Sequence, residues 1–424
     1  MYDVDTVDKA LLVIADPRDD READANTEEL RLLAESADVQ VVDEMHVRRQ
    51  HPDSRFYIGP GNAEDAFVRV QDSEATVVIL GADLSPSQQR NIEKATTVRV
   101  VDRTQLILDI FAQRARTSEG KLQVELAQLK YLLPRLSGKG IAMSRVGGGS
   151  AGVATRGPGE TKLETDRRRV RDRIALLKDE LEDVVKHRAV QNKSRKQLFV
   201  PSAALVGYTS AGKSTLLNLL TSAGVEVHAR LFATLDPTTR RVDLEDGTSI
   251  LLSDTVGFIR NLPHHLVASF RATLEEVIEA DFLIHVVDAS HHFVGEQRQA
   301  VSEVLGELGV QDKPVITVFN KSDRISDQYE LRRLIVETED SCYMSALTGE
   351  GQQHLETLIR KAVSRLMNRI RALVPYDRGD LVALCHERGH VISLEYVPEG
   401  VDLVVELPPD LAPRLAPFAR PTEE

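Results

Sequence analysis

One stretch of nine residues restricts what this chain can fold into more than any other feature. Residues 207–215 read GYTSAGKST, which is a complete phosphate-binding loop. Aliphatic residues 203–206 precede it and residues 216–220 follow with a helical pattern, so the loop has the strand–loop–helix context that it requires. Backbone N–H groups and the positive end of the helix would face phosphate oxygens. This predicts a nucleotide-binding domain with a doubly wound α/β sheet.

The residues of the loop have distinct predicted roles. Gly207 and Gly212 allow its curvature. Lys213 would reach the β and γ phosphates, which makes it a catalytic candidate, and the Ser214 hydroxyl would ligate Mg²⁺. The predicted nucleotide contacts in the loop are Gly207, Tyr208, Thr209, Ser210, Ala211, Gly212, Lys213, Ser214 and Thr215.

A second motif follows the predicted strand at residues 250–253. Asp254 suits a water-mediated contact to Mg²⁺, and the Gly257 N–H suits the γ-phosphate, so Gly257 is a catalytic candidate. Between the phosphate loop and this strand, a threonine is expected to complete Mg²⁺ coordination only when the γ-phosphate is present, which makes residues 231–240 an order–disorder switch. Thr234, Thr238 and Thr239 compete for this role by position. The predicted contacts after the strand are Asp254, Thr255, Val256 and Gly257.

Two further strings at strand ends indicate which base is bound. The Asp323 carboxylate can accept hydrogen bonds from guanine N1–H and N2–H₂, and adenine lacks this donor pair, so a buried unpaired carboxylate would penalise ATP. The backbone of residues 345–347 can meet guanine O6. Ligands bind at the carboxyl ends of strands in such sheets. The phosphate loop, residues 254–257, residues 320–323 and residues 345–347 each follow a predicted strand, and together they predict a site for a guanine nucleotide. The predicted base contacts are Asn320, Lys321, Ser322, Asp323, Ser345, Ala346 and Leu347.

The remaining chain predicts three further parts. Residues 10–115 alternate aliphatic runs with helical patterns, as in a small α/β domain with a largely parallel sheet. Two leucine-rich heptad seams of similar length, separated by a loop at 138–159 with eight glycines, predict an antiparallel helical coiled-coil hairpin. A small α+β domain ends the chain. The expected boundaries are 1–115, 116–197 for the hairpin, 198–370 for the nucleotide domain, and 371–424.

Charge is distributed unevenly between these parts. The whole chain carries −13, whereas residues 116–197 carry 19 basic and 10 acidic side chains, leaving −22 on the rest. A positive hairpin on a negative body suits a polyanion such as RNA, and a solvated coiled coil with a glycine-rich tip is the alternative. The candidate RNA contacts are Arg145, Arg156, Lys162, Arg167, Arg168 and Arg169.

The compartment follows from features that are missing. Two cysteines are too few for a disulfide framework. Asp3, Asp5 and Asp8 stand where a secretion signal would be positive, and no apolar run approaches the roughly 18–20 residues of a membrane helix. We expect a cytoplasmic monomer, since no self-complementary apolar stripe demands a dimer; peripheral membrane association stays compatible with the sequence.

Four stretches together resemble the HflX GTPases, ribosome-associated relatives of the Obg group. They are residues 102–129, 156–166 (RGPGETKLETD), 232–240 (FATLDPTTR) and 254–260 (DTVGFIR), and the likeness covers essentially the whole chain. The resemblance implies docking on the large ribosomal subunit near the peptidyl-transferase centre, and Mg²⁺- and GTP-dependent splitting or rescue of stalled ribosomes, especially under stress. It places the switch Mg²⁺ ligand, a catalytic candidate, at Thr234. The further contacts assigned to the nucleotide are Phe232, Ala233, Thr234, Leu235 and Asp236.

Two positions depart from what GTPases commonly carry. Phe258 follows Gly257, where many small GTPases have a glutamine that orients the attacking water. The family shares this absence of glutamine. An apolar ring cannot position water, so we expect slow intrinsic hydrolysis. Ser210 stands where many relatives have an asparagine that supports a catalytic K⁺ ion, which puts K⁺ stimulation in doubt.

A second hypothesis is a regulatory adaptor that senses the nucleotide for a protein partner. ATP use by residues 1–115 is disfavoured because they contain no complete phosphate loop.

Overall fold

The computed structural model describes residues 7–16, 20–48, 51–136, 162–196, 200–221, 231–232, 234–244, 248–260, 274–325, 328–409 and 411–421. The chain divides into two compact units. The first comprises Met1–His187, His228–Asp236 and Asn261–Thr273, and the second comprises Arg188–Val227, Pro237–Arg260 and Leu274–Glu424. The predicted glycine-rich loop at 138–159, with Arg145 and Arg156, lies outside the described residues.

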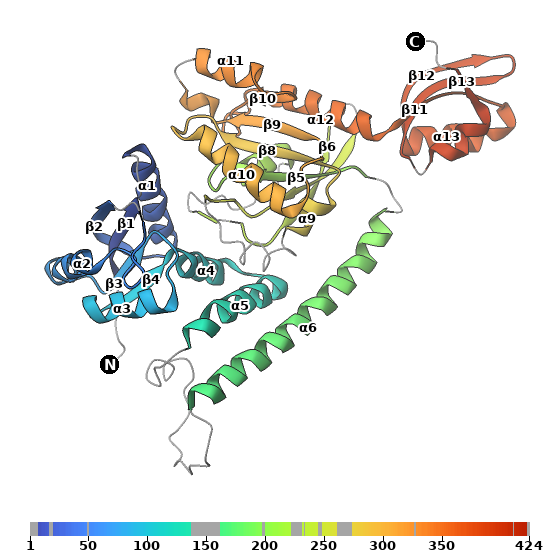
Figure 1. Cartoon of the computed structure of the whole chain (residues 1–424). Helices are drawn as coiled ribbons and strands as arrows, with labels where there is room; N and C mark the ends of the chain where they lie inside the picture. The colour runs from blue at the N-terminus through green and yellow to red at the C-terminus, as the bar shows by residue number, and fades with distance from the viewer. Residues whose placement is uncertain are drawn as a thin grey trace. The chain divides into compact units, whose positions relative to one another are not determined.

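A four-stranded parallel sheet forms the core of the first unit, as predicted (Figure 1). The strand order is β2-β1-β3-β4. Residues 10–14 of β1 and all of β3 are buried, which fits their nearly continuous aliphatic sequences. The elements are β1 (Lys9–Asp16), α1 (Asp20–Ser36), β2 (Gln40–Arg48), α2 (Pro60–Ser73), β3 (Val77–Leu80), α3 (Pro86–Thr96), β4 (Arg99–Asp102) and α4 (Arg103–Arg114).

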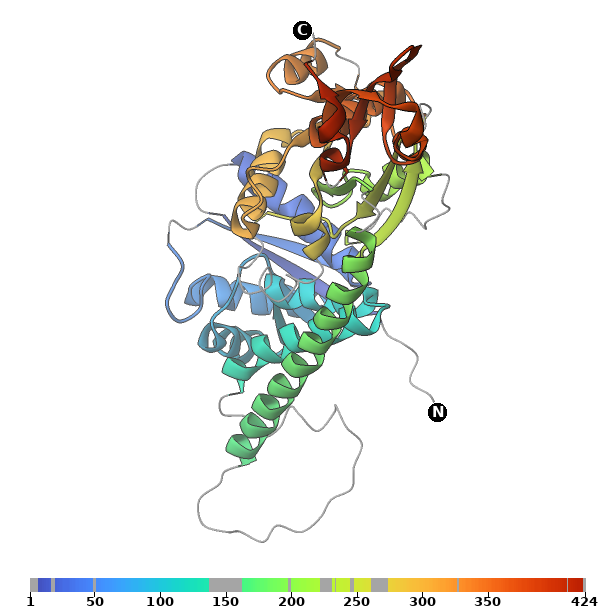
Figure 2. The ribbon, with the colours of Figure 1, turned by 90° about the vertical axis from the view of Figure 1, so that its right-hand side faces the viewer.

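The predicted helical hairpin consists of α5 (Ser118–Leu132) and α6 (Lys162–Lys196), the long helix in Figures 1 and 2. The Arg173 guanidinium binds the Glu125 carboxylate at 2.7 and 2.8 Å, and Arg167 Nε donates to the Leu136 carbonyl at 2.9 Å. Later residues of one helix thus meet earlier residues of the other, so the pair is antiparallel.

The two helices that carry the leucine-rich seams differ in length. Helix α5 has 15 residues, whereas α6 has 35. The chain passes from α5 into a short 3₁₀ turn, Leu133–Arg135, which contains Pro134. Proline lacks the N–H that an α-helix needs and clashes with the preceding turn, so the helix ends there despite the leucine pattern.

The second unit contains a doubly wound six-stranded sheet, which confirms the predicted fold of the nucleotide domain (Figure 1). The order is β10-β9-β8-β5-β7-β6, and only the edge strand β6 runs antiparallel. Its strands are β5 (Ser202–Gly207), β6 (Thr238–Asp243), β7 (Ser249–Asp254), β8 (Phe282–Asp288), β9 (Val315–Asn320) and β10 (Ser341–Tyr343). Its helices are α7 (Lys213–Thr221), α9 (Glu275–Glu279), α10 (Val294–Leu308), α11 (Gln328–Val336) and α12 (Gln352–Leu366).

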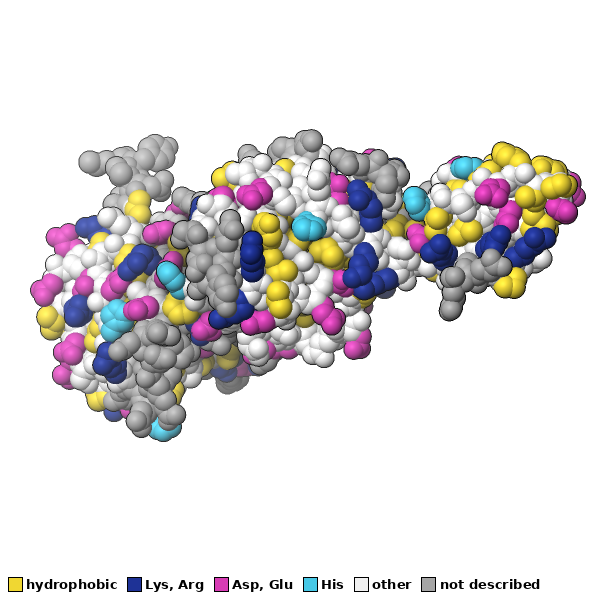
Figure 3. Space-filling view, turned by 90° about the horizontal axis from the view of Figure 1, so that it is seen from above, with side chains coloured by type: hydrophobic (Ala, Val, Ile, Leu, Met, Phe, Trp, Pro, Cys, Tyr) yellow, Lys and Arg dark blue, Asp and Glu magenta, His cyan; other side chains and the backbone are white. Residues whose placement is uncertain are grey.

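A small α+β domain follows, as predicted. Its antiparallel sheet has the order β12-β13-β11-β14, and α13 packs against its first three strands. Strand β11 carries Arg369 and Arg371 among its apolar residues. Figure 3 shows hydrophobic side chains on this domain, at the right of the view. The elements are β11 (Asn368–Val374), α13 (Gly379–Arg388), β12 (His390–Val397), β13 (Gly400–Leu407), α14 (Ala412–Leu415) and β14 (Ala419–Arg420).

Within the part of the chain that the structure describes, no helix has both the length and the apolar character needed to cross a bilayer.

Candidate nucleotide-binding site

The parallel strands of the six-stranded sheet bring the predicted motifs to one edge. Strand β5 ends at Gly207, β7 at Asp254 and β9 at Asn320. Strand β5 lies between β7 and β8, and the connections leave it in opposite directions. Such a switch point leaves a crevice outside the carboxyl ends of the strands, where ligands of open α/β sheets bind.

Two glycines of the phosphate loop stand where no other residue fits. Gly207 has φ +153°, and a Cβ there would lie 2.2 Å from the Val286 carbonyl oxygen. Gly212 has φ +100°, and a Cβ there would lie 2.2 Å from Nδ2 of Asn320. Both the backbone conformation and the close approach therefore require glycine. The loop shape follows from these two positions, as the sequence predicts.

Lys213 is held inside the phosphate loop. Its ammonium group donates to the carbonyl oxygens of Gly207 at 3.1 Å and Tyr208 at 3.0 Å, and the side chain is buried. Burial lowers the pKa of Lys213 to about 8, and the nearby Asp254 carboxylate opposes this shift. A buried cation with one partly compensating carboxylate is electrostatically suited to receive an anion such as a phosphate.

The two residues predicted to share Mg²⁺ touch each other. The Ser214 hydroxyl donates to Oδ2 of Asp254 at 2.6 Å, and Asp254 is fully buried at the end of β7. Hydroxyl and carboxylate oxygens are the hard ligands that Mg²⁺ prefers, so this pair fits the ion. The described residues contain no group of three or more His, Cys, Asp or Glu side chains placed to hold a metal.

The motif that begins at Asp254, which we call the second switch, lies against the phosphate loop. The Thr209 N–H donates to the Phe258 carbonyl at 2.8 Å, and the Phe258 N–H donates to the Gly207 carbonyl at 3.1 Å. A Cβ at Gly257 would lie 2.7 Å from Cγ2 of Thr209, so only glycine permits this approach. The Phe258 ring is buried. Sequence reasoning did not foresee this backbone pairing, since it depends on where the two loops meet.

Asn320 joins the phosphate loop to the predicted base-binding loop. Its Nδ2 donates to the Ala211 carbonyl at 2.8 Å, and its Oδ1 accepts from the Ala346 N–H at 2.9 Å. Asp323, the predicted guanine reader, is exposed, as is Leu347, whereas Ser345 is buried. Asn320 therefore joins the phosphate loop to the backbone of residues 345–347.

Sequence reasoning missed Asp288. Its Oδ2 lies 2.6 Å from Nζ of Lys321, and it stands at the end of β8, between the ends of β5 and β9. Lys321 adopts φ +64°, which is uncommon for a residue with a side chain. A carboxylate at the end of a central strand was a usable indication, and the ion pair orients the lysine of the base-binding motif.

The residues predicted around the first switch belong to the other compact unit. Phe232 and Leu235 are buried, Thr234 is half-buried, and the Asp236 carboxylate accepts from the Thr117 N–H at 2.9 Å. Ala233 lies outside the described residues. These contacts link the switch to the helix α5 region within the first unit.

The described part of the predicted RNA-binding set lies at the start of α6. Arg168 and Arg169 are exposed, and Arg169 approaches Asp166 at 3.8 Å. Arg167 is half-buried and is engaged with the Leu136 carbonyl. The Lys162 side chain is outside the described residues. The structure thus gives Arg167 a role in hairpin geometry and leaves its two neighbours at the surface.

Comparisons with known proteins cover nearly the whole chain. Residues 24–112 match a family model described as GTP-binding GTPase N-terminal, residues 114–195 match GTP-binding GTPase Middle Region, and residues 202–321 match 50S ribosome-binding GTPase. A GTPase HflX of Lacrimispora saccharolytica is 44% identical, over 96% of both chains. A GTPase HflX of Escherichia coli is 42% identical, over 90% of this chain and 89% of that one. A GTP-binding protein of Sulfolobus solfataricus, solved with GDP, is 28% identical over 85% of this chain and all of that one, with a TM-score of 0.45.

Proposed function

The chain belongs to the HflX family of GTPases, and from that membership we propose that it uses GTP to split or rescue stalled ribosomes at the large subunit. Binding and hydrolysis of GTP follow from the family and from the GTPase domain. The observation that supports the nucleotide part of the proposal is the convergence of Lys213, Asp254 and Asn320 on one sheet edge, with Asn320 bonded to both the phosphate loop and the base loop.

The proposed nucleotide contacts follow from this arrangement. Backbone N–H groups of residues 207–215 and the Lys213 ammonium would bind the phosphates. The Asp323 carboxylate would accept from guanine, and the backbone around Ala346 would meet O6. The hydrogen bonds of Asn320 support these separate roles, because they hold the phosphate loop and the base-binding loop next to each other.

Thr234 is the proposed switch ligand for Mg²⁺, together with Ser214 directly and Asp254 through water. The choice of Thr234 rests on the HflX resemblance; Thr238 and Thr239 lie in β6, where Thr239 Oγ1 shares a 2.8 Å hydrogen bond with Ser253 Oγ. When bound, Mg²⁺ would neutralise charge developing on the transferred phosphoryl group. The Gly257 N–H would bind the γ-phosphate.

Slow intrinsic hydrolysis is proposed for a physical reason. Phe258 carries an apolar ring that cannot orient an attacking water, and the ring is buried while its backbone is bonded to the phosphate loop. Completion of the catalytic site by the ribosome, or by a rearranged second switch, would then couple hydrolysis to the encounter with the ribosome.

Ribosome binding is supported by the hairpin and by the family. Residues 116–197 carry an excess of nine positive charges, and Arg168 and Arg169 lie exposed on α6. Phosphate backbones attract such a surface irrespective of base sequence. We propose that the hairpin contacts RNA of the large subunit, with Arg145 and Arg156 on the connecting loop among the contacts. The alternative function is a nucleotide-sensing adaptor for a protein partner.

Sedimentation with ribosomes tests the proposal. With a nonhydrolysable GTP analogue we expect the chain to pellet with large subunits and to raise the fraction of free subunits, and with GDP we expect much weaker association. Equal association in both nucleotide states would overturn the switch.

A variant with residues 138–159 shortened separates the two functions. It should bind GTP normally and lose its effect on ribosomes. If the full chain has no effect on ribosomes at all, the adaptor function is supported instead.

A further inference from the structure

A cavity of about 390 Å³ lies between α4 and one face of the sheet in the first compact unit. Val77 and Ile79 of β3 line it with buried aliphatic side chains, as does Leu106 of α4. Asp109 and Gln113 follow Leu106 at helical spacing and line the same cavity. A space of this size, with apolar walls and a few polar groups, is typical of sites that bind small molecules.

The Asp109 carboxylate is the polar group of this cavity that needs a donor. No described residue donates a hydrogen bond to it, and the Arg99 guanidinium, which acts on it through space, lies 3.6 Å from Asp8. Asp8 and Arg99 also line the cavity, so two carboxylates face one cation. Burial is the main cause that raises the pKa of Asp109 to about 6. Because buried polar groups are nearly always hydrogen-bonded, this carboxylate points to a donor from outside the chain.

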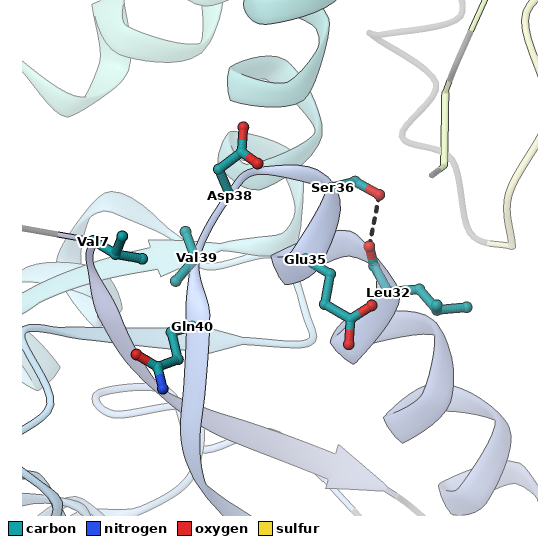
Figure 4. Close-up of a pocket in the computed structure, with 7 residues that line it drawn as sticks. All are labelled: Val7, Leu32, Glu35, Ser36, Asp38, Val39 and Gln40. Atoms are coloured by element: carbon teal, nitrogen blue, oxygen red, sulfur yellow. Dashed lines mark hydrogen bonds between the residues drawn. The ribbon is translucent and has the colours of Figure 1, made fainter. Parts of the chain in front are cut away.

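A neighbouring hollow is negative as well (Figure 4). Val39 lines both the cavity and this hollow of about 540 Å³, where Glu35 and Asp38 contribute carboxylates next to the aliphatic Leu32. Among the described residues that line the hollow, none is Lys, Arg or His. The last turn of α1 carries no basic residue to offset the negative end of its dipole. Both spaces therefore favour a cation over an anion.

We propose that the cavity binds an aliphatic polyamine, with one ammonium group paired to Asp109 and the methylene stem against the apolar side chains of β3 and α4. A primary ammonium has three donors and no acceptor. Gln113 Nε2 donates to the Ala37 carbonyl at 3.4 Å, which leaves the Gln113 amide oxygen as a second acceptor. A neutral ligand would leave the carboxylate unpaired. The negative hollow beyond Val39 favours a molecule with a second ammonium group.

Cadaverine, a diamine with a five-carbon stem, is the probe. Calorimetric titration of the full chain at physiological ionic strength should show saturable binding of cadaverine and none of 1,5-pentanediol, which has the same stem without the charges. Nα-acetyllysine amide carries one such ammonium on a peptide unit. Binding of both amines supports the site and admits a lysine side chain of a protein, and binding of cadaverine alone supports it for free polyamines.

Two substitutions should move the affinity in opposite directions. Asp109→Asn should weaken cadaverine by about tenfold or more, because the ammonium loses its charged acceptor. Since this variant removes a buried charge, its loss of binding cannot come from unfolding. Arg99→Gln should strengthen binding, because it removes the cation that competes for the carboxylate. Asp65→Asn makes the same change of charge at an exposed place on α2 and should bind as the wild type does.

The pH dependence gives an independent readout. Binding should weaken about tenfold between pH 7.5 and pH 5, because a proton on Asp109 displaces the ammonium as the pH falls through about 6. The other charged groups that line the cavity or act on Asp109 are Asp8, Arg99 and Asp102. The Asp109→Asn variant should lose this dependence.

The outcomes are separate from those for the nucleotide site. Lys213→Ala should bind cadaverine as the wild type does, since no residue of the nucleotide site lines the cavity. Absence of saturable cadaverine binding overturns the proposal. Equal affinity in the wild type and Asp109→Asn, weaker binding in Arg99→Gln, or equal binding of the diol overturns it as well.

Discussion

The amide nitrogen of Asn320 donates a hydrogen bond to the carbonyl oxygen of Ala211 at 2.8 Å. These residues lie 109 positions apart in the chain, one at the end of β9 and the other in the phosphate loop. The oxygen of the same amide receives the Ala346 N–H. One buried side chain therefore holds the loop for the phosphates and the loop for the base, and we expect the two parts of nucleotide recognition to fail together when it is removed.

Replacing Asn320 with Ala should weaken GDP and GTP by at least about tenfold each and destabilise the chain by about 1–3 kcal/mol, because a buried acceptor and a buried donor lose their partner. Calorimetry and denaturant unfolding measure both quantities. Asn91→Ala is the control, since Asn91 also bonds a carbonyl, that of Arg55 at 2.8 Å, at an exposed place in the other unit. If the variant bound GDP and GTP more weakly but kept its full preference for guanine, Asn320 would not connect phosphate binding to base recognition.

Lys213→Met should abolish nucleotide binding and yet stabilise the nucleotide-free chain, by about 1–3 kcal/mol at pH 7. Burial lowers the pKa of Lys213 to about 8, so at pH 7 the folded state carries a cation at a cost that methionine avoids. For the same reason the wild-type chain should gain stability between pH 8 and about 10.5, where the unfolded state binds more protons. Thermal unfolding with and without GDP checks this. A lower midpoint for the variant would show that the hydrogen bonds of the ammonium outweigh its burial.

Ser214→Ala should remove the benefit of Mg²⁺ for GTP binding. The variant loses the hydroxyl that now donates to Asp254 at 2.6 Å, and with it a direct oxygen ligand. We expect the Mg²⁺ concentration for half-maximal GTP binding to rise about tenfold or more, with little change in affinity when a chelator is present. Thr221→Val removes a hydroxyl from the same helix, bonded to the Leu217 carbonyl, and should behave as wild type. An unchanged Mg²⁺ titration for Ser214→Ala would exclude it as a ligand.

Asp323→Asn should exchange guanine for xanthine as the preferred base. A carboxamide presents one acceptor and one donor, which matches the N1–H and the C2 carbonyl of xanthine and mismatches guanine. The lost pairing should weaken GTP by about 100-fold or more, since leaving polar groups unpaired is strongly discriminated. Competition between GTP and XTP for the purified variant gives the answer. Retention of GTP preference would place base recognition elsewhere.

Asp109→Asn should stabilise the chain at neutral pH and have no effect at pH 4. Burial raises the pKa of Asp109 to about 6, the Asp102 carboxylate adds to the shift, and Arg99 opposes it. The folded state thus binds the proton more tightly than the unfolded state, and stability is lost as pH rises from about 4 through about 6. We expect a gain of about 1–3 kcal/mol at pH 7.5 from denaturant unfolding. Asp65→Asn, at an exposed position on α2, should show no such gain.

Local patterns were sufficient to place the predicted motifs at strand ends of one sheet. The predicted motifs stand at the ends of β5, β7 and β9. They could be predicted because a strand that ends in a polar turn is recognisable from a few neighbouring residues. Asp288 was missed, although its position after an aliphatic run was informative. Pro134 marks the end of α5, as its place near the end of the leucine pattern predicts, because proline cannot continue an α-helix.

The amino-acid sequence by itself determined a GTP site of the P-loop type, because the backbone of a contiguous loop makes most of the contacts that phosphates need. It also determined the alternation of strands and helices around both α/β sheets. Only the tertiary structure decided that Asp236 caps α5, a contact across 119 residues to Thr117. No local pattern encodes such a pairing, since it arises when two distant segments are packed against the same domain.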